Sequence, residues 1–153
     1  RKLEFTPDLI VLAAGSGGTH AGWLVGTRAL DSPWAGESFT VSREAEAAQT
    51  EIARLATAAA ALLGLDWRFA PDEAIVLGGF IGQGYGIPSP EAADAIRLVG
   101  RSEGVLLDPT YTGKAMAGFL DHLRRGLVAH RSIVFLHTGG EPAFLAGEGE
   151  WLA

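Results

Sequence analysis

Short runs of apolar residues alternate along the chain with longer stretches in which apolar residues recur at helical spacing. The runs at 9–13, 37–42, 74–77 and 132–136 have the length of strands. The stretches at 20–30, 44–63, 90–99 and 112–125 predict helices. Buried strands that alternate with helices are typical of a parallel sheet covered on both faces. We therefore expect an α/β fold in which a mostly parallel sheet lies between two layers of helices, a three-layer αβα arrangement.

Three of the predicted helices carry further local signals. In the helix at 44–63, which Gly64 ends, we expect these residues to face the core: Ile52, Leu55, Leu62 and Leu63. In the helix at 112–125, the expected inward residues are Met116, Phe119, Leu120 and Leu123. Ser89 is expected to cap the helix at 90–99, because Pro90 and Glu91 follow it in the first turn.

The first strand runs directly into a loop of small residues, which are Gly15, Ser16, Gly17, Gly18 and Thr19. We expect Thr19 to cap the helix that begins at His20. A strand, a glycine loop and a helix start in this order collect unpaired backbone N–H groups at the positive end of a helix dipole. The loop therefore favours an anion, and above all a phosphate.

The residues around the loop argue against two common classes of phosphate ligand, nucleoside triphosphates and dinucleotides. A P-loop would need a lysine after the last glycine, but Thr19 and His20 follow Gly18. A dinucleotide fingerprint would need a glycine at position 20, and an acid where Ser42 and Arg43 stand. A single phosphate monoester fits better, and a plain glycine-rich turn that binds nothing is the alternative.

Composition bounds the other possibilities. The 153 residues fit one domain, and 48% hydrophobic residues suffice for a buried core. A net charge of −6, with no basic cluster and no apolar stretch of membrane-spanning length, favours small molecules over nucleic acid or a membrane as partners. The absence of cysteine fits a reducing compartment and excludes a thiolate nucleophile. The spacing of the four histidines, His20, His122, His130 and His137, predicts no metal site.

The loops after parallel strands meet at one rim of a sheet. There the sequence places the glycine loop, the glycine-rich segment around Tyr85, the turn at Tyr111 and Thr112, and the turn at 137–140. Several residues in these segments also have a purely structural interpretation. Tyr85 and Tyr111 would pack at the rim, and His137 would have its hydrogen bonds satisfied within the fold. Asp108 and Pro109 would form a turn. For Lys114 we expect a solvated or helix-terminal charge.

Four motifs along the chain carry a resemblance to a known family. They are SGGTHAG at 16–22, GYGIPS at 84–89, EGVLLDPTYTGKAMAG at 103–118 and HTGGEPAF at 137–144. Together they resemble the large domain of the pyridoxal-phosphate enzymes that include D-cysteine desulfhydrase and 1-aminocyclopropane-1-carboxylate deaminase, of the tryptophan-synthase-β-like fold type II. The resemblance implies that residues 15–19 hold the phosphate of pyridoxal 5'-phosphate. It also implies that Tyr85 and Tyr111 are catalytic and that Thr112 faces the pyridine nitrogen.

The resemblance also implies parts that this sequence lacks. In the family, a lysine in the amino-terminal half holds the cofactor covalently, and neither Lys2 nor Lys114 matches that position. The chain opens on Arg1 without a methionine. We therefore expect residues 1–153 to be one α/β domain, the carboxyl-terminal half of a longer enzyme, and to be inactive alone. The family further implies a cytoplasmic homodimer.

Thr112 bears on the reaction that the resemblance implies. Deaminases that open a cyclopropane ring carry a glutamate at this position, which keeps the pyridine nitrogen protonated, and a threonine hydroxyl cannot do so. A weaker electron sink favours α,β-elimination of a good leaving group. We expect a lyase that converts D-cysteine to pyruvate, sulfide and ammonia, with cysteate sulfo-lyase or 1-aminocyclopropane-1-carboxylate deaminase as alternatives in the family. A non-catalytic phosphate-binding domain and a sugar-phosphate isomerase domain are alternatives from other classes.

Overall fold

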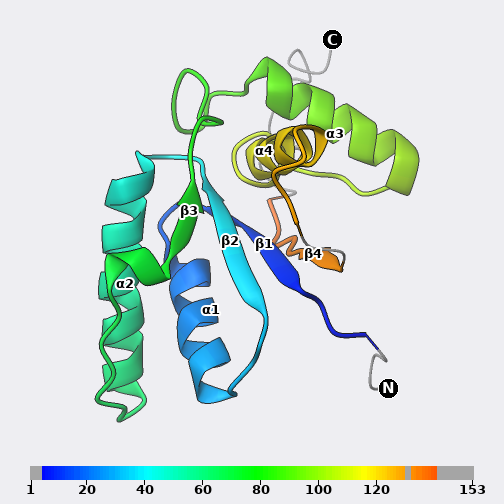
Figure 1. Ribbon diagram of the computed structural model, residues 1–153. Coiled ribbons are helices and arrows are strands. Elements are labelled where there is room, and N and C mark those ends of the chain that lie inside the picture. Colours follow the sequence, from blue (N-terminus) through cyan, green and yellow to red (C-terminus); the bar gives the residue numbers. More distant parts are fainter. Residues whose placement is uncertain (1–4, 130–131, 141–153) are drawn as a thin grey trace.

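The computed structural model describes residues 5–129 and 132–140, and within them four parallel strands form one sheet (Figure 1). The strands are β1 (Leu9–Ala14), β2 (Ala35–Thr40), β3 (Ile75–Leu77) and β4 (Ile133–Phe135). Their order across the sheet is β3-β2-β1-β4, and every pairing is parallel. The predicted α/β class with a parallel sheet is therefore confirmed.

Strand β1 lies between two neighbours. Leu9 pairs with Ala35 of β2 on one side and with Ile133 of β4 on the other. Leu9, Val11 and Leu12 are completely buried, because helices cover both faces of the sheet at this strand. A strand covered on both faces is apolar throughout rather than alternating, which explains the sequence of the run.

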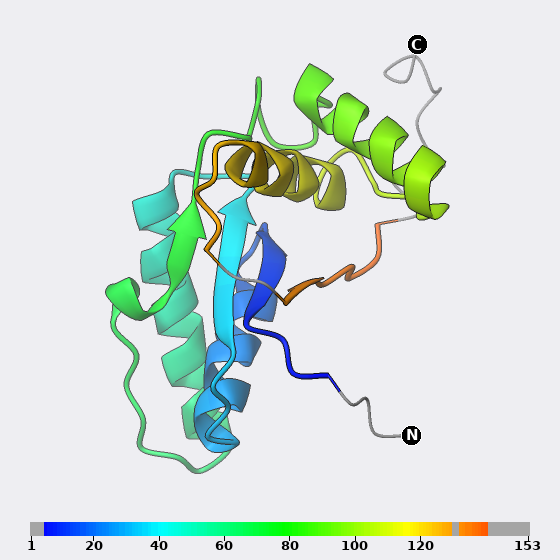
Figure 2. The same ribbon diagram turned by 45° about the vertical axis from the view of Figure 1, so that its right-hand side comes forward.

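Helices form the two outer layers. On one face lie α1 (Gly18–Ala29) and α2 (Ala45–Leu62), and on the other α4 (Thr112–Arg124), with α3 (Pro90–Glu103) packed against α4. The two ribbon views agree on this arrangement (Figure 2). A short 3-10 helix, η1 (Pro71–Glu73), precedes β3. The predicted three-layer αβα arrangement is therefore confirmed.

The two sides of the sheet pack differently. Against α1 and α2 the core contains many alanines, among them Ala48, Ala53, Ala56 and Ala60. On the other side Phe39 of β2 packs directly against Gly118 of α4. The contact is so close that a Cβ added at Gly118 would stand 2.3 Å from Phe39 Cδ1. A side chain at 118 would push α4 away from the strands, so glycine at this position sets how closely the helix lies over the sheet.

The structure corrects several predicted details. Helix α1 begins at Gly18, so Thr19 lies in its first turn and Gly17 is the cap residue. Helix α3 runs past Val99 to Glu103, and its cap residue, Gly104, has a left-handed conformation. Ser89 caps α3 as expected, because its side chain accepts the N–H of Ala92.

Three of the expected inward leucines face solvent instead. Leu62 and Leu63 are 90% and 66% exposed at the end of α2, and Leu123 is 41% exposed near the end of α4. Ala60 in the last turn of α2 is completely buried, so the helix is still covered at this end. Leu62 lies two residues further on, about 200° around the helix, and therefore points away from the inward face, which is formed by alanines and Ile52.

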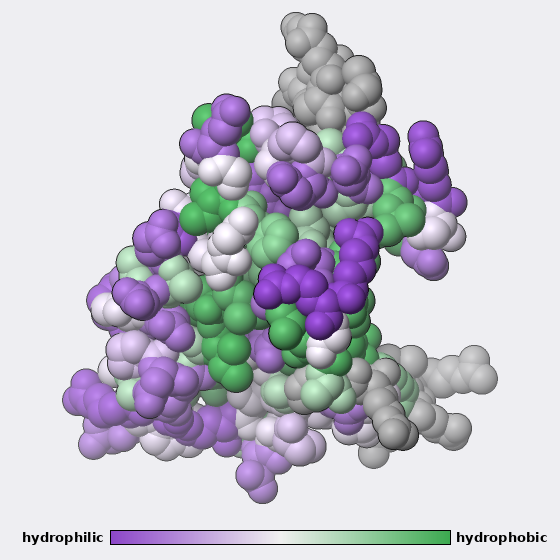
Figure 3. Space-filling view, turned by 45° about the horizontal axis from the view of Figure 1, so that its top comes forward, coloured by the Kyte–Doolittle hydropathy of each residue, from purple (hydrophilic) through white to green (hydrophobic). Residues whose placement is uncertain are grey.

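Other large apolar side chains are also exposed among the described residues, including Leu30, Leu106 and Leu127. In the space-filling view, apolar surface lies open in the middle of one face (Figure 3). No helix in the described part of the chain has the length and apolar character that a membrane span requires.

Candidate active site

The loop after β1 leaves backbone N–H groups free for a ligand. Gly17 caps α1 with a φ of +93°, and among the described residues no side chain accepts a capping hydrogen bond from the first turn of this helix. That turn carries no acidic residue. A Cβ on Gly17 would lie 2.9 Å from Ile52 Cγ1, so both the conformation and the packing require glycine. The loop thus has the backbone features that an anion cradle requires, and the binding of a phosphate there stays a prediction.

The Asp108 carboxylate organises the start of α4. The side chain is buried, and its two oxygens accept the N–H groups of Thr110, Tyr111 and Thr112, each at 2.8 Å. Oδ1 also accepts the Thr112 hydroxyl at 2.7 Å. Asp108 thus caps the helix as well as forming the expected turn, and it holds the backbone on both sides of Tyr111.

Tyr111 touches both the glycine loop and the segment that carries Tyr85. A Cβ on Gly15 would stand 3.0 Å from Tyr111 Cε1, so the ring lies directly on the loop. The hydroxyls of Tyr85 and Tyr111 are hydrogen-bonded, and their ring centroids are 5.9 Å apart at an angle of 68°. This hydrogen bond raises the pKa of Tyr111 above its ordinary value, helped by burial and by the negative charge of Asp108. The Tyr111 phenol therefore keeps its proton at neutral pH.

A cavity of about 310 Å³ joins these parts. Its lining includes all five residues of the predicted phosphate loop, Gly15 to Thr19, together with both tyrosines. The turn after β4 completes it with Thr138, Gly139 and Gly140. Residues from four separate segments thus meet at the carboxyl ends of the strands, where a parallel sheet places its ligand site.

Thr112 is the predicted site residue that does not line this cavity. Its side chain is completely buried, and its hydroxyl donates to Asp108 Oδ1 and accepts the Asp108 N–H at 2.9 Å. Thr138, by contrast, lines the cavity. Sequence analysis placed the 137–140 turn on the rim but assigned Thr138 no role, although its position after the last strand was a usable signal.

His137 fits its structural reading. Its Nε2 lies 2.8 Å from the carbonyl oxygen of Leu106, and Nδ1 accepts the N–H of Gly139 at 3.2 Å. The ring thus holds the turn that brings Thr138 to the cavity. Residues 141–144 of the same motif lie outside the described residues.

Lys114 meets one part of its expectation. It lies at a helix end, in the first turn of α4, but its side chain is completely buried rather than solvated. Its Nζ donates to the carbonyl oxygens of Ile81 and Gly84, each at 2.7 Å. The lysine amine is thus bound to backbone and does not line the cavity. Lys2 lies outside the described residues.

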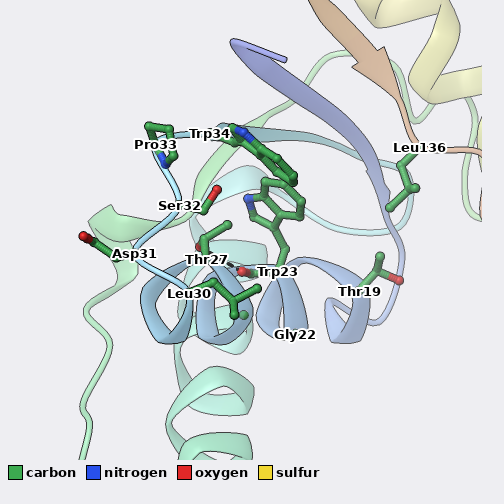
Figure 4. A pocket seen from close by; sticks show the side chains of 11 residues that line it. Thr19, Gly22, Trp23, Thr27, Leu30, Asp31, Ser32, Pro33, Trp34 and Leu136 are labelled. Atoms are coloured by element: carbon green, nitrogen blue, oxygen red, sulfur yellow. Dashed lines mark hydrogen bonds between the residues drawn. The ribbon is translucent and has the colours of Figure 1, made fainter. Parts of the chain in front are cut away.

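A larger hollow of about 600 Å³ lies along α1 and the segment after it (Figure 4). Trp23 and Trp34 stack in it with ring centroids 6.0 Å apart, and Leu30 and Leu136 add to its mostly apolar lining. It shares only Thr19 with the smaller cavity and contains neither tyrosine. The chemistry-bearing groups therefore mark the smaller cavity as the candidate active site.

Comparisons with known proteins place this geometry in a family. Over 140 residues the chain is 41% identical to D-cysteine desulfhydrase of Yersinia pestis (strain Pestoides F), and equally to that of Yersinia pseudotuberculosis (serotype O:1b, strain IP 31758). These matches cover 90% of this chain and 41% of each relative, so the chain spans about two fifths of their length.

A solved structure described as an ACC deaminase homologue superimposes with a TM-score of 0.79 at 37% sequence identity. The match covers 91% of this chain and 41% of that one. The model of the family "Pyridoxal-phosphate dependent enzyme" matches residues 1–139. This chain therefore belongs to the pyridoxal-phosphate dependent enzyme family.

Proposed function

We propose that this chain forms the phosphate-binding and tyrosine-bearing part of a lyase that eliminates the β-substituent of a small amino acid, first of all D-cysteine. The overall reaction converts D-cysteine and water to pyruvate, sulfide and ammonia. The observation that carries the proposal is the single cavity in which the glycine loop meets Tyr85 and Tyr111. The names of the relatives support the substrate class.

The residues of the cavity fit pyridoxal phosphate. The unpaired first-turn N–H groups of α1 suit a phosphate dianion, and the hydroxyls of Ser16 and Thr19 stand beside them. When bound, the cofactor supplies an electron sink for the α-carbon of the amino acid. We assign the phosphate to residues 15–19. The resemblance implies that Thr112 contacts the pyridine nitrogen, but its side chain is completely buried outside the cavity lining, so Thr138, which lines the cavity, is the second candidate for this contact.

The tyrosine pair can assist the leaving group. Elimination breaks the Cα–H and Cβ–S bonds: the electron pair of the first forms the new C=C bond, its proton passes to a base that we place outside this sequence, and sulfur departs as hydrosulfide with the pair of the second. The Tyr111 phenol, which its raised pKa keeps protonated, can donate a hydrogen bond to the departing sulfur, and Tyr85 orients it through the hydrogen bond between their hydroxyls.

The amine that holds the cofactor is proposed to lie outside this sequence. Lys114 donates to two carbonyl groups and lies away from the cavity lining. We therefore propose that activity belongs to a longer protein, in which residues 1–153 form the carboxyl-terminal half. We also propose a cytoplasmic homodimer, which sedimentation and cell fractionation of the whole protein would test.

The experiment measures ammonia release, which is common to all four reactions, by the whole protein with D-cysteine, L-cysteine, cysteate and 1-aminocyclopropane-1-carboxylate as separate substrates. D-cysteine is expected to be turned over fastest, and Tyr85→Phe and Tyr111→Phe each to lower its turnover by at least roughly 10²-fold with the cofactor absorbance retained. Pyruvate or sulfite from cysteate, or 2-oxobutyrate from the cyclopropane substrate, as the faster product would move the protein to the corresponding alternative. No turnover of any of them, with phosphate binding intact, would favour a non-catalytic domain.

A further inference from the structure

Lys114 stands where local physics disfavours a lysine. The first turn of a helix carries the positive end of the dipole, and Lys114 places a cationic side chain there with no acidic residue in the same turn. The side chain is also completely buried, which costs free energy unless its donors are satisfied. A residue that is unfavourable by itself needs a compensating contact.

The compensating contact is with the loop between β3 and α3. Nζ donates to the carbonyl oxygens of Ile81 and Gly84 at 2.7 Å each. Burial lowers the pKa of Lys114, and the nearby negative charge of Asp108 opposes this shift. The ammonium thus bonds two carbonyl groups of one loop in a site closed to water.

Apart from Lys114, the loop is held by Phe80, which packs against Phe39, and by a hydrogen bond from the Ile87 N–H to the Gly84 carbonyl oxygen. Between β3 and α3 it has no regular secondary structure, and Gly79, Gly82 and Gly86 have φ values of +92°, +70° and +77°. Glycines in such conformations are costly to order, because the unfolded chain has more freedom there than at other residues. A fixed conformation therefore depends on the contacts that the loop makes with the rest of the molecule.

The loop carries Tyr85, and α4 carries Tyr111 at its start. Gly84, whose carbonyl binds Lys114, directly precedes Tyr85, and Lys114 follows Tyr111 by three residues. The side chain of Lys114 therefore links the two segments behind the tyrosine pair. Tyr85 is itself 55% exposed, so its own contacts are open to competition from water.

We propose that Lys114 is a positioning residue for the reaction: by binding the carbonyl oxygens of Ile81 and Gly84, it holds the Tyr85 hydroxyl against Tyr111. The proposal rests on the proposed function for its catalytic consequence. Its structural part, the fixing of the 78–88 loop, does not need a known substrate.

The test replaces the amine without removing the packing. Lys114→Met in the whole protein should raise the rate of hydrogen exchange of the Ile87 amide, which donates to the Gly84 carbonyl that Lys114 also binds, at least about tenfold. Phe119→Leu is the matched control, because Phe119 lies on the same helix and its ring packs against Phe135 of β4. It should leave exchange of the Ile87 amide unchanged. Unchanged exchange in Lys114→Met would overturn the proposal whatever the substrate.

A double-mutant cycle then separates positioning from a general loss of stability. Lys114→Met should lower kcat by roughly 10- to 10²-fold with KM nearly unchanged, and should cost less than about twofold more when Tyr85→Phe is already present. Losses that multiply in the double variant would show that Lys114 does not act through Tyr85. If Lys114→Met does not fold, Lys114→Gln takes its place, because its shorter amide cannot reach both carbonyls. Wild-type loop exchange in that variant would equally overturn the proposal.

Discussion

The Asp108 carboxylate accepts both the backbone N–H and the hydroxyl of Thr112, at 2.8 and 2.7 Å, inside a site that water does not reach. The same carboxylate accepts two further N–H groups before the helix begins. Buried N–H groups that lose their acceptor retain the full cost of leaving water. The geometry at the start of α4 therefore depends on this one side chain.

Asp108→Ala should lower the free energy of unfolding by about 2 to 4 kcal/mol, because it removes a helix cap and leaves several donors unpaired. Asp108→Asn should lower the free energy of unfolding by less than Asp108→Ala does, since its amide oxygen can still accept hydrogen bonds. Urea unfolding measures both. Asp121→Asn on the same helix is the control, because its pair with Arg125 is exposed and worth less than about 1 kcal/mol. Equal losses in all three variants would remove Asp108 from this role.

Thr112→Val should lower the free energy of unfolding by about 1 kcal/mol, because the buried hydroxyl bonds with Asp108 are lost while the shape of the side chain is kept. Thr112→Ser should retain most of the wild-type free energy of unfolding, because serine keeps the hydroxyl. If Thr112 also contacts the pyridine nitrogen, Thr112→Val shifts the absorbance of the bound cofactor. If Thr138 makes that contact, only Thr138→Val produces the shift.

Gly18→Val should weaken binding of inorganic phosphate and of pyridoxal phosphate at least tenfold, or about 1.4 kcal/mol. A Cβ on Gly18 meets only Ser16 Oγ at 3.8 Å, so the fold tolerates the side chain, which then occupies the mouth of the loop. Gly22→Ala is the control, because it lies on the same helix with open space around it and outside the cavity. Calorimetry that shows unchanged affinity in Gly18→Val would reject the phosphate assignment.

Acid should destabilise the protein through His20. Its ring is completely buried with Nδ1 2.8 Å from Ser38 Oγ, and burial lowers the pKa of His20 to about 4. Between pH 6.5 and 4 the unfolded state binds a proton that the folded state does not, so stability falls as the pH falls. The loss approaches about 3 kcal/mol over this window. Urea unfolding at pH 7.5 and 4.5 should show a smaller loss in His20→Gln, and parallel losses in both proteins would contradict the assignment.

The sequence by itself determined the class of the fold and the backbone of the glycine loop at 15–19. The apolar runs of β1 and β4 are local signals, and so are the glycines at which α1 begins. Each depends on residues within a few positions, because hydrophobic periodicity and the conformational freedom of glycine act over that range. Tyr85 and Tyr111 were identified as candidate catalytic residues from the resemblance to a family, because no local sequence pattern assigns them that role.

Only the tertiary structure decided which side chains are buried and which meet. From the sequence, Lys114 is expected to be a solvated or helix-terminal charge, but the 78–88 loop brings two carbonyl groups to its buried side chain. Leu62 is expected in the core, but the face of α2 that packs inward is the one that carries Ala60. Tyr85 and Tyr111 are 26 positions apart in the chain, yet their hydroxyls are bonded. Such contacts depend on how helices dock on the sheet, and that docking is set by close packing between segments distant in sequence.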